Sequence, residues 1–210
     1  FAVAIDPRGR YAYVSDEVSN LVHVVDIDPR SSTFHTRVRT LSVGIAPIGL
    51  RGLAVSPDGK RLYVAVPAVN IQAPSSATGV GEIAVFDTDP AASFMGFLRA
   101  IPAGAEPYGI TVVSNAEILF TNRREDSKGE GMLKANATAT SFTVETMPLT
   151  LGSGADSFDV NNATAIVVTP DRQYAFVTGF NRFLPESPSA NPFLDPDLPG
   201  GSNVGIIADP

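Results

Sequence analysis

The sequence predicts an all-β fold made of repeated four-stranded sheets, and three observations support this prediction. A stretch of alternating apolar residues, interrupted by a turn, occurs four times in the 210 residues. The 18 glycines and 17 prolines are spread along the chain, as is typical of short strands joined by turns. Apolar residues make up 44% of the chain and charged residues only 18%, so a chain of this length can bury a substantial core.

The repeated stretch reads as a strand, a tight turn and a second strand. In its clearest copy, LAVSPDGKRLYVAV at residues 53–66, two alternating runs flank a Pro-Asp-Gly turn. The other copies are AVAIDPRGRYAYVS, ITVVSNAEILFTN and AIVVTPDRQYAFVTG. Aligning Pro7, Pro57, Ser114 and Pro170 gives intervals of 50, 57 and 56 residues. Because the turn residues differ between copies, we interpret the turn as structural rather than as a ligand cradle, and we expect Lys60 and Arg61 to be solvated.

Two further strands follow most of these pairs. Third strands are predicted at 21–29, 82–90, 131–138 and 204–210, and fourth strands at 34–44, 94–104 and 141–152. Four antiparallel strands in a repeat of roughly 50 residues form the pattern of a β-propeller blade. We therefore predict about four blades, at 1–44, 45–104, 105–152 and 153–210, the last without its outer strand.

Both ends of the sequence fall inside predicted blades. Phe1 already stands in an alternating run, and Pro210 comes before any fourth strand of the last repeat. We expect the chain to be a fragment of a six- to eight-bladed propeller. Further blades of the same polypeptide, or other protein subunits, would then complete the ring.

The residues around the turn resemble the YVTN-repeat family. VGIAPIGLRGLAVSPDGKRLYVA (43–65), AGAEPYGITVV (103–113) and IAVFDTDP (83–90) follow its order of elements: a Gly/Pro loop, an innermost strand, a Ser-Pro-Asp-Gly turn, a Tyr-Val strand and a strand ending in Asp. The third and fourth repeats depart from this pattern at the turn and at the loop before the first strand, respectively. The resemblance implies a propeller of the kind found in surface-layer-like proteins and lactonase-like enzymes, commonly with about seven blades.

The strand order of a blade sorts its loops onto two faces. The second-to-third loops and the loops that lead into the next blade share one face, here called the loop face, and the first-to-second turns lie on the other, the turn face. The long segments 67–81 and 180–203 are both second-to-third loops, and loops of this length are often functional, although propellers also tolerate insertions there. A binding surface on the loop face is therefore predicted, with candidates Asn70, Gln72, Asp156, Asp159 and Asn181.

A calcium site is the one metal site that the sequence suggests. Asp195 and Asp197 form an Asp-x-Asp pair near glycines, and calcium prefers such oxygen ligands. The absence of cysteine excludes thiol catalysis, thiolate metal sites and covalent haem attachment through cysteine. No other cofactor is expected.

Charge and hydropathy exclude two classes of partner. A net charge of −7 with scattered Lys and Arg argues against nucleic acid binding, and Arg123-Arg124, the longest basic run, is interpreted as a solvated turn. No apolar stretch approaches the roughly 20 residues needed to span a bilayer. We expect an exported protein located in the periplasm, at the cell surface or outside the cell.

Catalytic motifs are sparse in this sequence. Only His23 and His35 offer an imidazole for general base catalysis, and a strand histidine is more often packed or simply exposed. Asp26 and Asp87 end equivalent strands, and this repetition predicts a structural role in which they bond the backbone of the following turn. No Gly-x-Ser-x-Gly, P-loop or dinucleotide fingerprint occurs.

These observations favour a non-enzymatic propeller that acts as a protein-interaction or assembly module of the cell envelope or of an extracellular complex. The alternative is a lactonase-like hydrolase with a site at the central channel. A propeller subunit of a larger redox or envelope complex is a third possibility. The fold alone does not choose among them.

Overall fold

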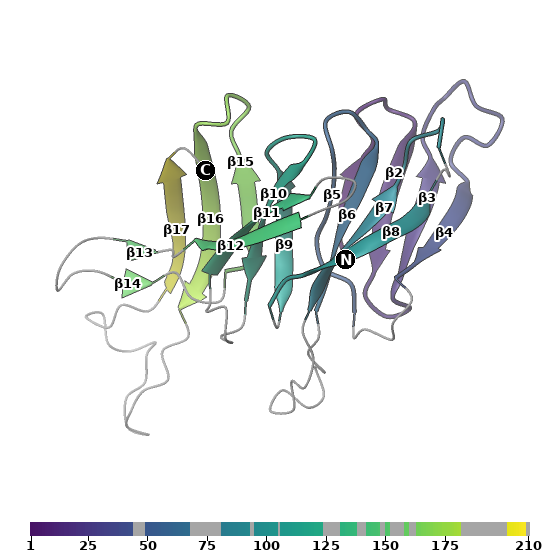
Figure 1. The fold of residues 1–210 in the computed structure, drawn as a ribbon. Coiled ribbons are helices and arrows are strands. Elements are labelled where there is room, and N and C mark those ends of the chain that lie inside the picture. Colours follow the sequence, from purple (N-terminus) through teal and green to yellow (C-terminus); the bar gives the residue numbers. More distant parts are fainter. Residues whose placement is uncertain are drawn as a thin grey trace.

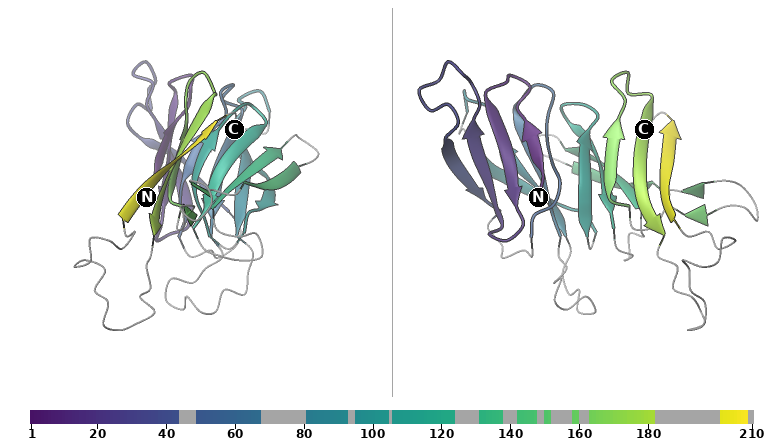
Figure 2. Two further views of the ribbon diagram at one scale, coloured as in Figure 1. Left: turned by 90° about the vertical axis from the view of Figure 1, so that its left-hand side faces the viewer. Right: turned by 180° about the vertical axis from the view of Figure 1, so that it is seen from behind.

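The computed structural model is built from β-strands joined by turns and loops, and the part of the chain that it describes contains no helix. It follows that no helix in this part is long and apolar enough to cross a membrane. The structure describes residues 1–43, 49–67, 81–92, 95–104, 106–123, 131–137, 142–147, 150–151, 158–159, 163–181 and 201–208. Four antiparallel sheets stand side by side in chain order (Figures 1 and 2).

Within each sheet, every strand pairs with the next one in the chain. The first sheet contains β1 (Val3–Ile5), β2 (Tyr11–Asp16), β3 (Leu21–Asp26) and β4 (Arg37–Ser42). The second contains β5 (Leu53–Val55), β6 (Arg61–Val66), β7 (Glu82–Asp87) and β8 (Gly96–Pro102). The third contains β9 (Pro107–Val112), β10 (Glu117–Asn122), β11 (Gly131–Ala137) and β12 (Phe142–Met147). The fourth contains β15 (Ala165–Val168), β16 (Tyr174–Asn181) and β17 (Gly201–Ala208).

The predicted fold class is therefore confirmed, with one local difference. The segment 141–152, predicted as a single fourth strand, divides into β12 and β13 (Thr150–Leu151), and β13 pairs with β14 (Phe158–Asp159). Pro148 lies between the two strands and has no backbone N–H to donate to a ladder. A proline directly after Met147 in the sequence disfavours continuation of the ladder.

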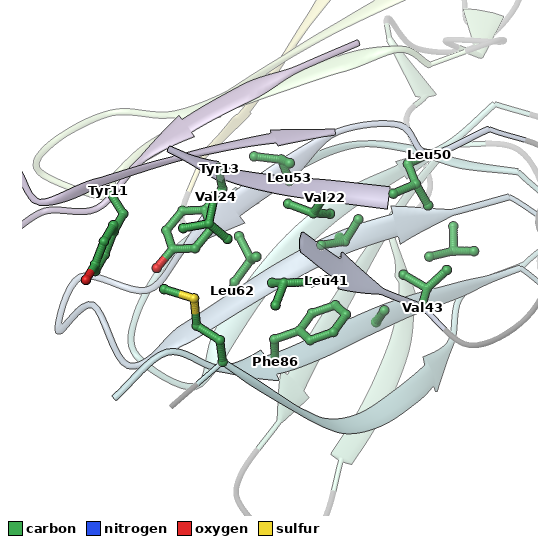
Figure 3. Packing of buried hydrophobic residues seen from close by; sticks show 14 residues of the cluster. Tyr11, Tyr13, Val22, Val24, Leu41, Val43, Leu50, Leu53, Leu62 and Phe86 are labelled. Atoms are coloured by element: carbon green, nitrogen blue, oxygen red, sulfur yellow. The ribbon is translucent and has the colours of Figure 1, made fainter. Parts of the chain in front are cut away.

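Apolar residues between successive sheets form the core. The first strands β1, β5, β9 and β15 contact one another in that order, as innermost strands of neighbouring blades do. Between the first two sheets, Tyr13, Val24 and Leu41 pack with Leu62 and Phe86 (Figure 3). Two further buried clusters fill the second and third junctions. Each interior sheet thus buries both of its faces, and each sheet is treated below as one blade.

The outward face of the first blade is apolar but exposed. Val3 is 61% exposed, whereas Leu53 and Ile110, its equivalents in the second and third blades, are buried. At the other end of the row, Val167 and Tyr174 of the fourth blade are also exposed. Large exposed apolar side chains on a sheet face indicate a surface that packs against another element.

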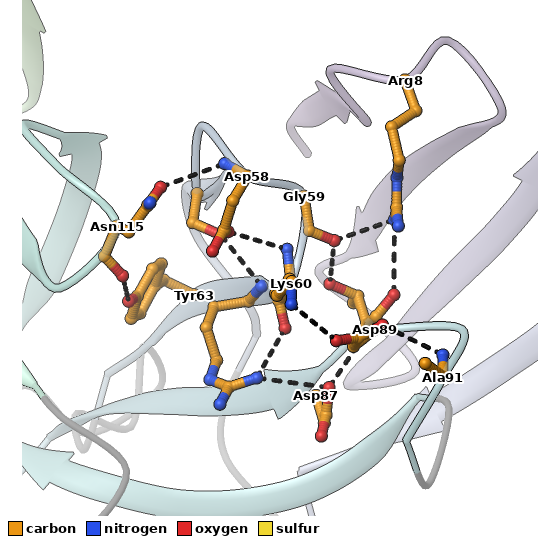
Figure 4. Close-up of polar contacts among 12 residues, drawn as sticks. Arg8, Asp58, Gly59, Lys60, Tyr63, Asp87, Asp89, Ala91 and Asn115 are labelled. Carbon is orange, nitrogen blue, oxygen red and sulfur yellow. Dashed lines mark hydrogen bonds and ion pairs between the residues drawn. The ribbon is translucent and has the colours of Figure 1, made fainter.

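The repeated turns connect neighbouring blades on the turn face (Figure 4). The Arg8 guanidinium of the first turn donates to the Gly59 carbonyl of the second turn, with Nη2 and O 2.8 Å apart. The Asp58 amide of the second turn donates to Oδ1 of Asn115 in the third, at 3.0 Å. The hydroxyl of Tyr63 also donates to the Asn115 carbonyl, at 3.3 Å. These contacts agree with a structural role for the turn.

Lys60 and Arg61 differ from the expectation of simple solvated charges. Lys60 Nζ lies 3.1 Å from Oδ2 of Asp89, and Arg61 Nη1 lies 3.2 Å from Oδ1 of Asp87. Because β6 and β7 are neighbouring antiparallel strands, Arg61 at the start of β6 is paired with Asp87 at the end of β7, and Lys60 just before β6 is paired with Asp89 just after β7.

The strand-ending aspartates bond the turns that follow them, as predicted. Oδ1 of Asp26 accepts the Asp28 amide at 2.9 Å, and Oδ2 accepts the hydroxyls of Ser31 and Thr33, both at 2.6 Å. Oδ1 of Asp87 accepts the Asp89 amide at 2.9 Å. Equivalent carboxylates therefore order equivalent turns in two blades.

We expect Asp26 to make the stability of the protein sensitive to acid. The hydroxyls of Ser31 and Thr33 hold the pKa of Asp26 below its ordinary value of 3.8. A lowered carboxyl pKa contributes stability above the ordinary pKa, and this contribution is lost as the pH falls through the folded-state pKa. The melting temperature should fall more steeply below about pH 4 in the unchanged protein than in the Asp26→Asn variant. Circular dichroism melts across this range measure both slopes, and equal slopes would contradict the assignment.

Candidate functional site

The predicted loop-face residues lie mostly beyond the described ranges. Asn70, Gln72 and Asp156 fall outside the described residues, as do the calcium candidates Asp195 and Asp197. Asp159 ends β14 and Asn181 ends β16. Within the described part of the chain, no three acidic or histidine side chains are grouped to hold a metal ion. The calcium site stays a prediction.

The two histidines do not form a catalytic arrangement. Nε2 of His23, on β3, lies 3.4 Å from Oδ2 of Asp16, which also accepts the Ser19 hydroxyl at 2.5 Å. The carboxylate therefore stands between the serine and the imidazole, so His23 cannot take the serine proton directly. His35 follows β3 in an exposed loop and stacks on Phe34, with ring centroids 3.6 Å apart.

One position at the loop-face end of the innermost strands is equivalent in all four blades. Strand pairing aligns Val3, Leu53, Ile110 and Ile166, which oppose the second strand at the same register point. The residues two places before them are called the quartet here: Phe1, Arg51, Tyr108 and Thr164.

Three members of the quartet converge. The rings of Phe1 and Tyr108 meet edge to face, with centroids 5.4 Å apart, although they belong to the first and third blades. The Arg51 guanidinium carbon lies 5.2 Å from the Phe1 centroid and 5.4 Å from that of Tyr108. On Tyr108, the guanidinium carbon of Arg123 lies at 4.6 Å. These are cation–π distances, and they place side chains from three blades in one cluster next to the innermost strands.

Two ion pairs extend this cluster, Arg51 with Glu17 and Arg123 with Glu106. In each pair one side chain is buried and its partner reaches solvent. Arg51 is 4% exposed and Glu17 43%, while Glu106 is 9% exposed and Arg123 34%. The cluster therefore presents one carboxylate and one guanidinium to solvent, each oriented by a buried group of opposite charge.

Backbone contacts fix the second pair further. The Glu106 amide donates to Oδ1 of Asn122 at 2.9 Å, and the Arg123 amide donates to the Glu106 carbonyl at 2.9 Å. Arg123 is thus held to Glu106 through both its main chain and its side chain. Such double attachment reduces the entropy lost when the guanidinium binds a ligand.

Glu82 is a separate carboxyl group on the same face. It begins β7, and burial raises its pKa above the ordinary value. A carboxyl group with a raised pKa suits proton donation. No described contact connects Glu82 to the cluster, so we treat it as peripheral.

The cluster can supply two elements of acyl-transfer chemistry. A solvent-facing carboxylate such as Glu17 can take a proton from an attacking water. A fixed guanidinium such as Arg123 can donate hydrogen bonds to a developing oxyanion. The aromatic rings of Phe1 and Tyr108 provide an apolar wall beside both groups.

This cluster was not predicted from the sequence. The interpretation of Arg123 as part of a solvated turn is wrong, because the side chain pairs with Glu106 and stacks on Tyr108. Arg51 was not singled out because its partners Glu17 and Tyr108 lie 34 and 57 residues away. The available signal was the small residue that follows each quartet position: Ala2, Gly52, Gly109 and Ala165.

Comparison with protein families gives one match. The family model described as "Lactonase, 7-bladed beta-propeller" matches residues 3–168, most of the chain. No curated protein sequence matches the chain.

Solved structures share the fold at low sequence identity. A Bacteroides fragilis protein provisionally named 6-phosphogluconolactonase has a TM-score of 0.55 at 14% identity, over 78% of this chain and 40% of that one. The periplasmic gluconolactonase of Pseudomonas aeruginosa gives 0.52 at 19% identity, over 78% and 40%. The β-propeller domain of Cps50 from Myceliophteria thermophila gives 0.59 at 14% identity, over 85% and 50%. The chain thus spans about 40% to 50% of the length of these structures.

The expectation of a non-enzymatic interaction module is wrong. The family match overturns it and favours the alternative, a lactonase-like hydrolase. The lactonase-like part of the sequence resemblance is confirmed by the same match. The error arose because candidate chemistry was sought in the long loops and the histidines, whereas the charged cluster is assembled from short segments next to the innermost strands.

Proposed function

Because the chain belongs to the lactonase family of seven-bladed β-propellers, we propose that the protein is a lactonase-like hydrolase that opens the ring of a sugar-acid lactone. The observation that carries this proposal is that the loop face presents both a carboxylate, Glu17, and a guanidinium, Arg123, each held by an ion pair with a buried partner. The site lies beside the propeller axis, where side chains from three blades converge.

The proposed reaction uses water and needs no cofactor. Glu17 takes a proton from a water molecule as it attacks the lactone carbonyl carbon. Arg123 stabilises the oxyanion of the tetrahedral intermediate. The bond between the former carbonyl carbon and the ring oxygen then breaks. Protonated Glu17 returns its proton to the ring oxygen, which gives the open hydroxy acid. Arg51 and Glu106 hold the two reacting side chains in place.

An anionic substituent on the substrate fits the cluster. The Arg123 guanidinium is 34% exposed and lies on the Tyr108 ring, and the buried guanidinium of Arg51 lies on the same ring. Guanidinium groups bind phosphate and carboxylate well. The names of two neighbours, a gluconolactonase and a 6-phosphogluconolactonase, supply the neutral and the anionic substrate to compare.

Four finer statements belong to the same proposal. The turn sequences support YVTN-repeat ancestry, and the periplasmic neighbour supports export. The exposed apolar faces around Val3 and Val167 support packing against further blades of the same polypeptide. Calcium at Asp195 and Asp197 would have a structural role in this scheme, because the proposed reaction is complete without it.

A lactone hydrolysis assay tests this function. We expect the purified protein to accelerate the opening of glucono-δ-lactone and of its 6-phosphate above the spontaneous rate, with faster turnover of the phosphorylated compound. Proton release in weak buffer follows the reaction continuously. Rates for both compounds equal to the protein-free background would contradict the proposal.

A further inference from the structure

The same backbone atom of the quartet is held at every described junction between blades. The Arg51 carbonyl accepts the Ser15 hydroxyl of the preceding blade at 2.9 Å. The Tyr108 carbonyl accepts the Gly52 amide at 2.8 Å. The third junction repeats this contact, where the Thr164 carbonyl accepts the Thr121 hydroxyl at 3.3 Å. Each blade therefore fixes the main chain of the next quartet residue.

Ser15 and Thr121 occupy equivalent places at the ends of second strands, and Ala65 takes that place in the second blade. Ala65 has no hydroxyl to donate, and there the amide of Gly52 makes the contact itself. Equivalent carbonyls thus accept hydrogen bonds from two different kinds of donor, a side-chain hydroxyl and a backbone amide. This shows that the position of the carbonyl, rather than the identity of its donor, is what the junctions share.

The blades also differ in side-chain chemistry at the quartet position, although its neighbours are alike. The next residue is always Ala or Gly, and the one after it is always aliphatic. The quartet itself contains a phenyl ring, a guanidinium, a phenol and a hydroxyl. A structural role would favour one residue type in every blade, as it does for the neighbouring positions. A fixed main chain that carries a different side chain in each blade is instead typical of a position that determines ligand specificity.

We propose that the quartet determines the ligand specificity of this face, with each blade contributing one side chain to a common site beside the axis. This inference rests on the proposed function for its substrate, and it adds which residues select that substrate. Phe1 and Tyr108 would contact the ring of the ligand, and the positive charge of Arg51, which is buried, would favour an anionic substituent without direct contact. Thr164 is the quartet residue best suited to a substitution that changes ligand preference. Its hydroxyl makes two long contacts with Thr178 of its own blade, at 3.3 and 3.4 Å, so replacing it disturbs little.

The test adds a charge at Thr164 and measures binding rather than turnover. Isothermal titration calorimetry compares 6-phosphogluconate with gluconate as ligands of the unchanged protein and of the Thr164→Arg variant. Gln173→Arg is the matched control, because it adds the same charge to an exposed turn of the same blade on the opposite face. We expect Thr164→Arg to raise the affinity ratio of 6-phosphogluconate to gluconate about tenfold, because the phosphate adds negative charge to the carboxylate that both ligands carry, and Gln173→Arg to change this ratio less than about twofold.

Two results would overturn the inference. One is a ratio in the Thr164→Arg variant that matches the Gln173→Arg control. The other is the absence of measurable 6-phosphogluconate binding by the Thr164→Arg variant. A shifted ratio in a protein without hydrolytic activity would support the quartet as a specificity position and contradict the lactonase function, so the two proposals fail separately. Thr164 is only half-buried, so the variant is expected to fold.

Discussion

Replacing Gly109 by alanine is expected to destabilise the protein strongly, and far more than the same substitution at Gly9. A Cβ atom at this residue would lie 2.3 Å from the Thr164 carbonyl oxygen and 3.1 Å from the Ala165 Cα. Both atoms belong to the backbone of the next blade, so no flexible side chain can move aside. The Gly109 amide also donates to the Thr121 hydroxyl that bonds Thr164, so any displacement disturbs this junction.

We expect Gly109→Ala to lower the free energy of unfolding by about 3 kcal/mol or more, because overpacking against backbone forces the blades apart. Urea denaturation followed by circular dichroism measures this change. Gly9→Ala is the control: no atom lies within 4 Å of the added methyl group, and the cost arises only from its φ of +69°. That backbone strain is about 1 kcal/mol. A Gly109 variant no less stable than the Gly9 variant would contradict the close approach of these blades.

The largest expected effect on activity comes from Glu17. The Glu17→Gln change keeps the shape of the side chain and a hydrogen-bond acceptor for Arg51, but removes the carboxylate that takes the proton from water. General base catalysis contributes about 10²- to 10⁴-fold to a rate, so kcat for lactone opening should fall by about that factor. KM should change little, because the aromatic residues and Arg123 remain in place. Initial rates at several substrate concentrations separate the two constants.

Asp171→Asn is the matched control for Glu17→Gln. Asp171 is an exposed carboxylate in the turn between β15 and β16, on the opposite face, and its removal changes the net charge by the same amount. We expect this variant to retain the kcat of the unchanged protein. If both variants lost activity equally, the loss would reflect net charge or stability rather than a base at Glu17.

The architecture could be predicted from the sequence because short stretches of residues specify each strand and turn, and these stretches recur in every blade. The run LAVSPDGKRLYVAV specifies β5, a turn and β6 through alternation and turn chemistry, and both act over a few residues. The bonding role of Asp26 and Asp87 was predictable for the same reason, since each aspartate bonds the turn that directly follows it. Repetition across blades then distinguished structural residues from others.

The candidate site could not be predicted in the same way, because its contacts connect distant parts of the chain. Arg51 finds Glu17 in the previous blade and Tyr108 in the next, and no local pattern connects them. Phe1 and Tyr108 touch only because the innermost strands of three blades stand side by side. A search for residues that break the repeat, rather than for those that follow it, would have found the quartet.

The most direct test of the account is the rate of lactone opening by the unchanged protein, measured beside the Glu17→Gln and Asp171→Asn variants. With 6-phosphoglucono-δ-lactone as substrate, we expect rapid proton release by the unchanged protein and by Asp171→Asn, and a rate at least about a hundredfold lower in Glu17→Gln. A Glu17→Gln variant that opens the lactone as fast as the unchanged protein would contradict the central claim that this cluster is the catalytic site.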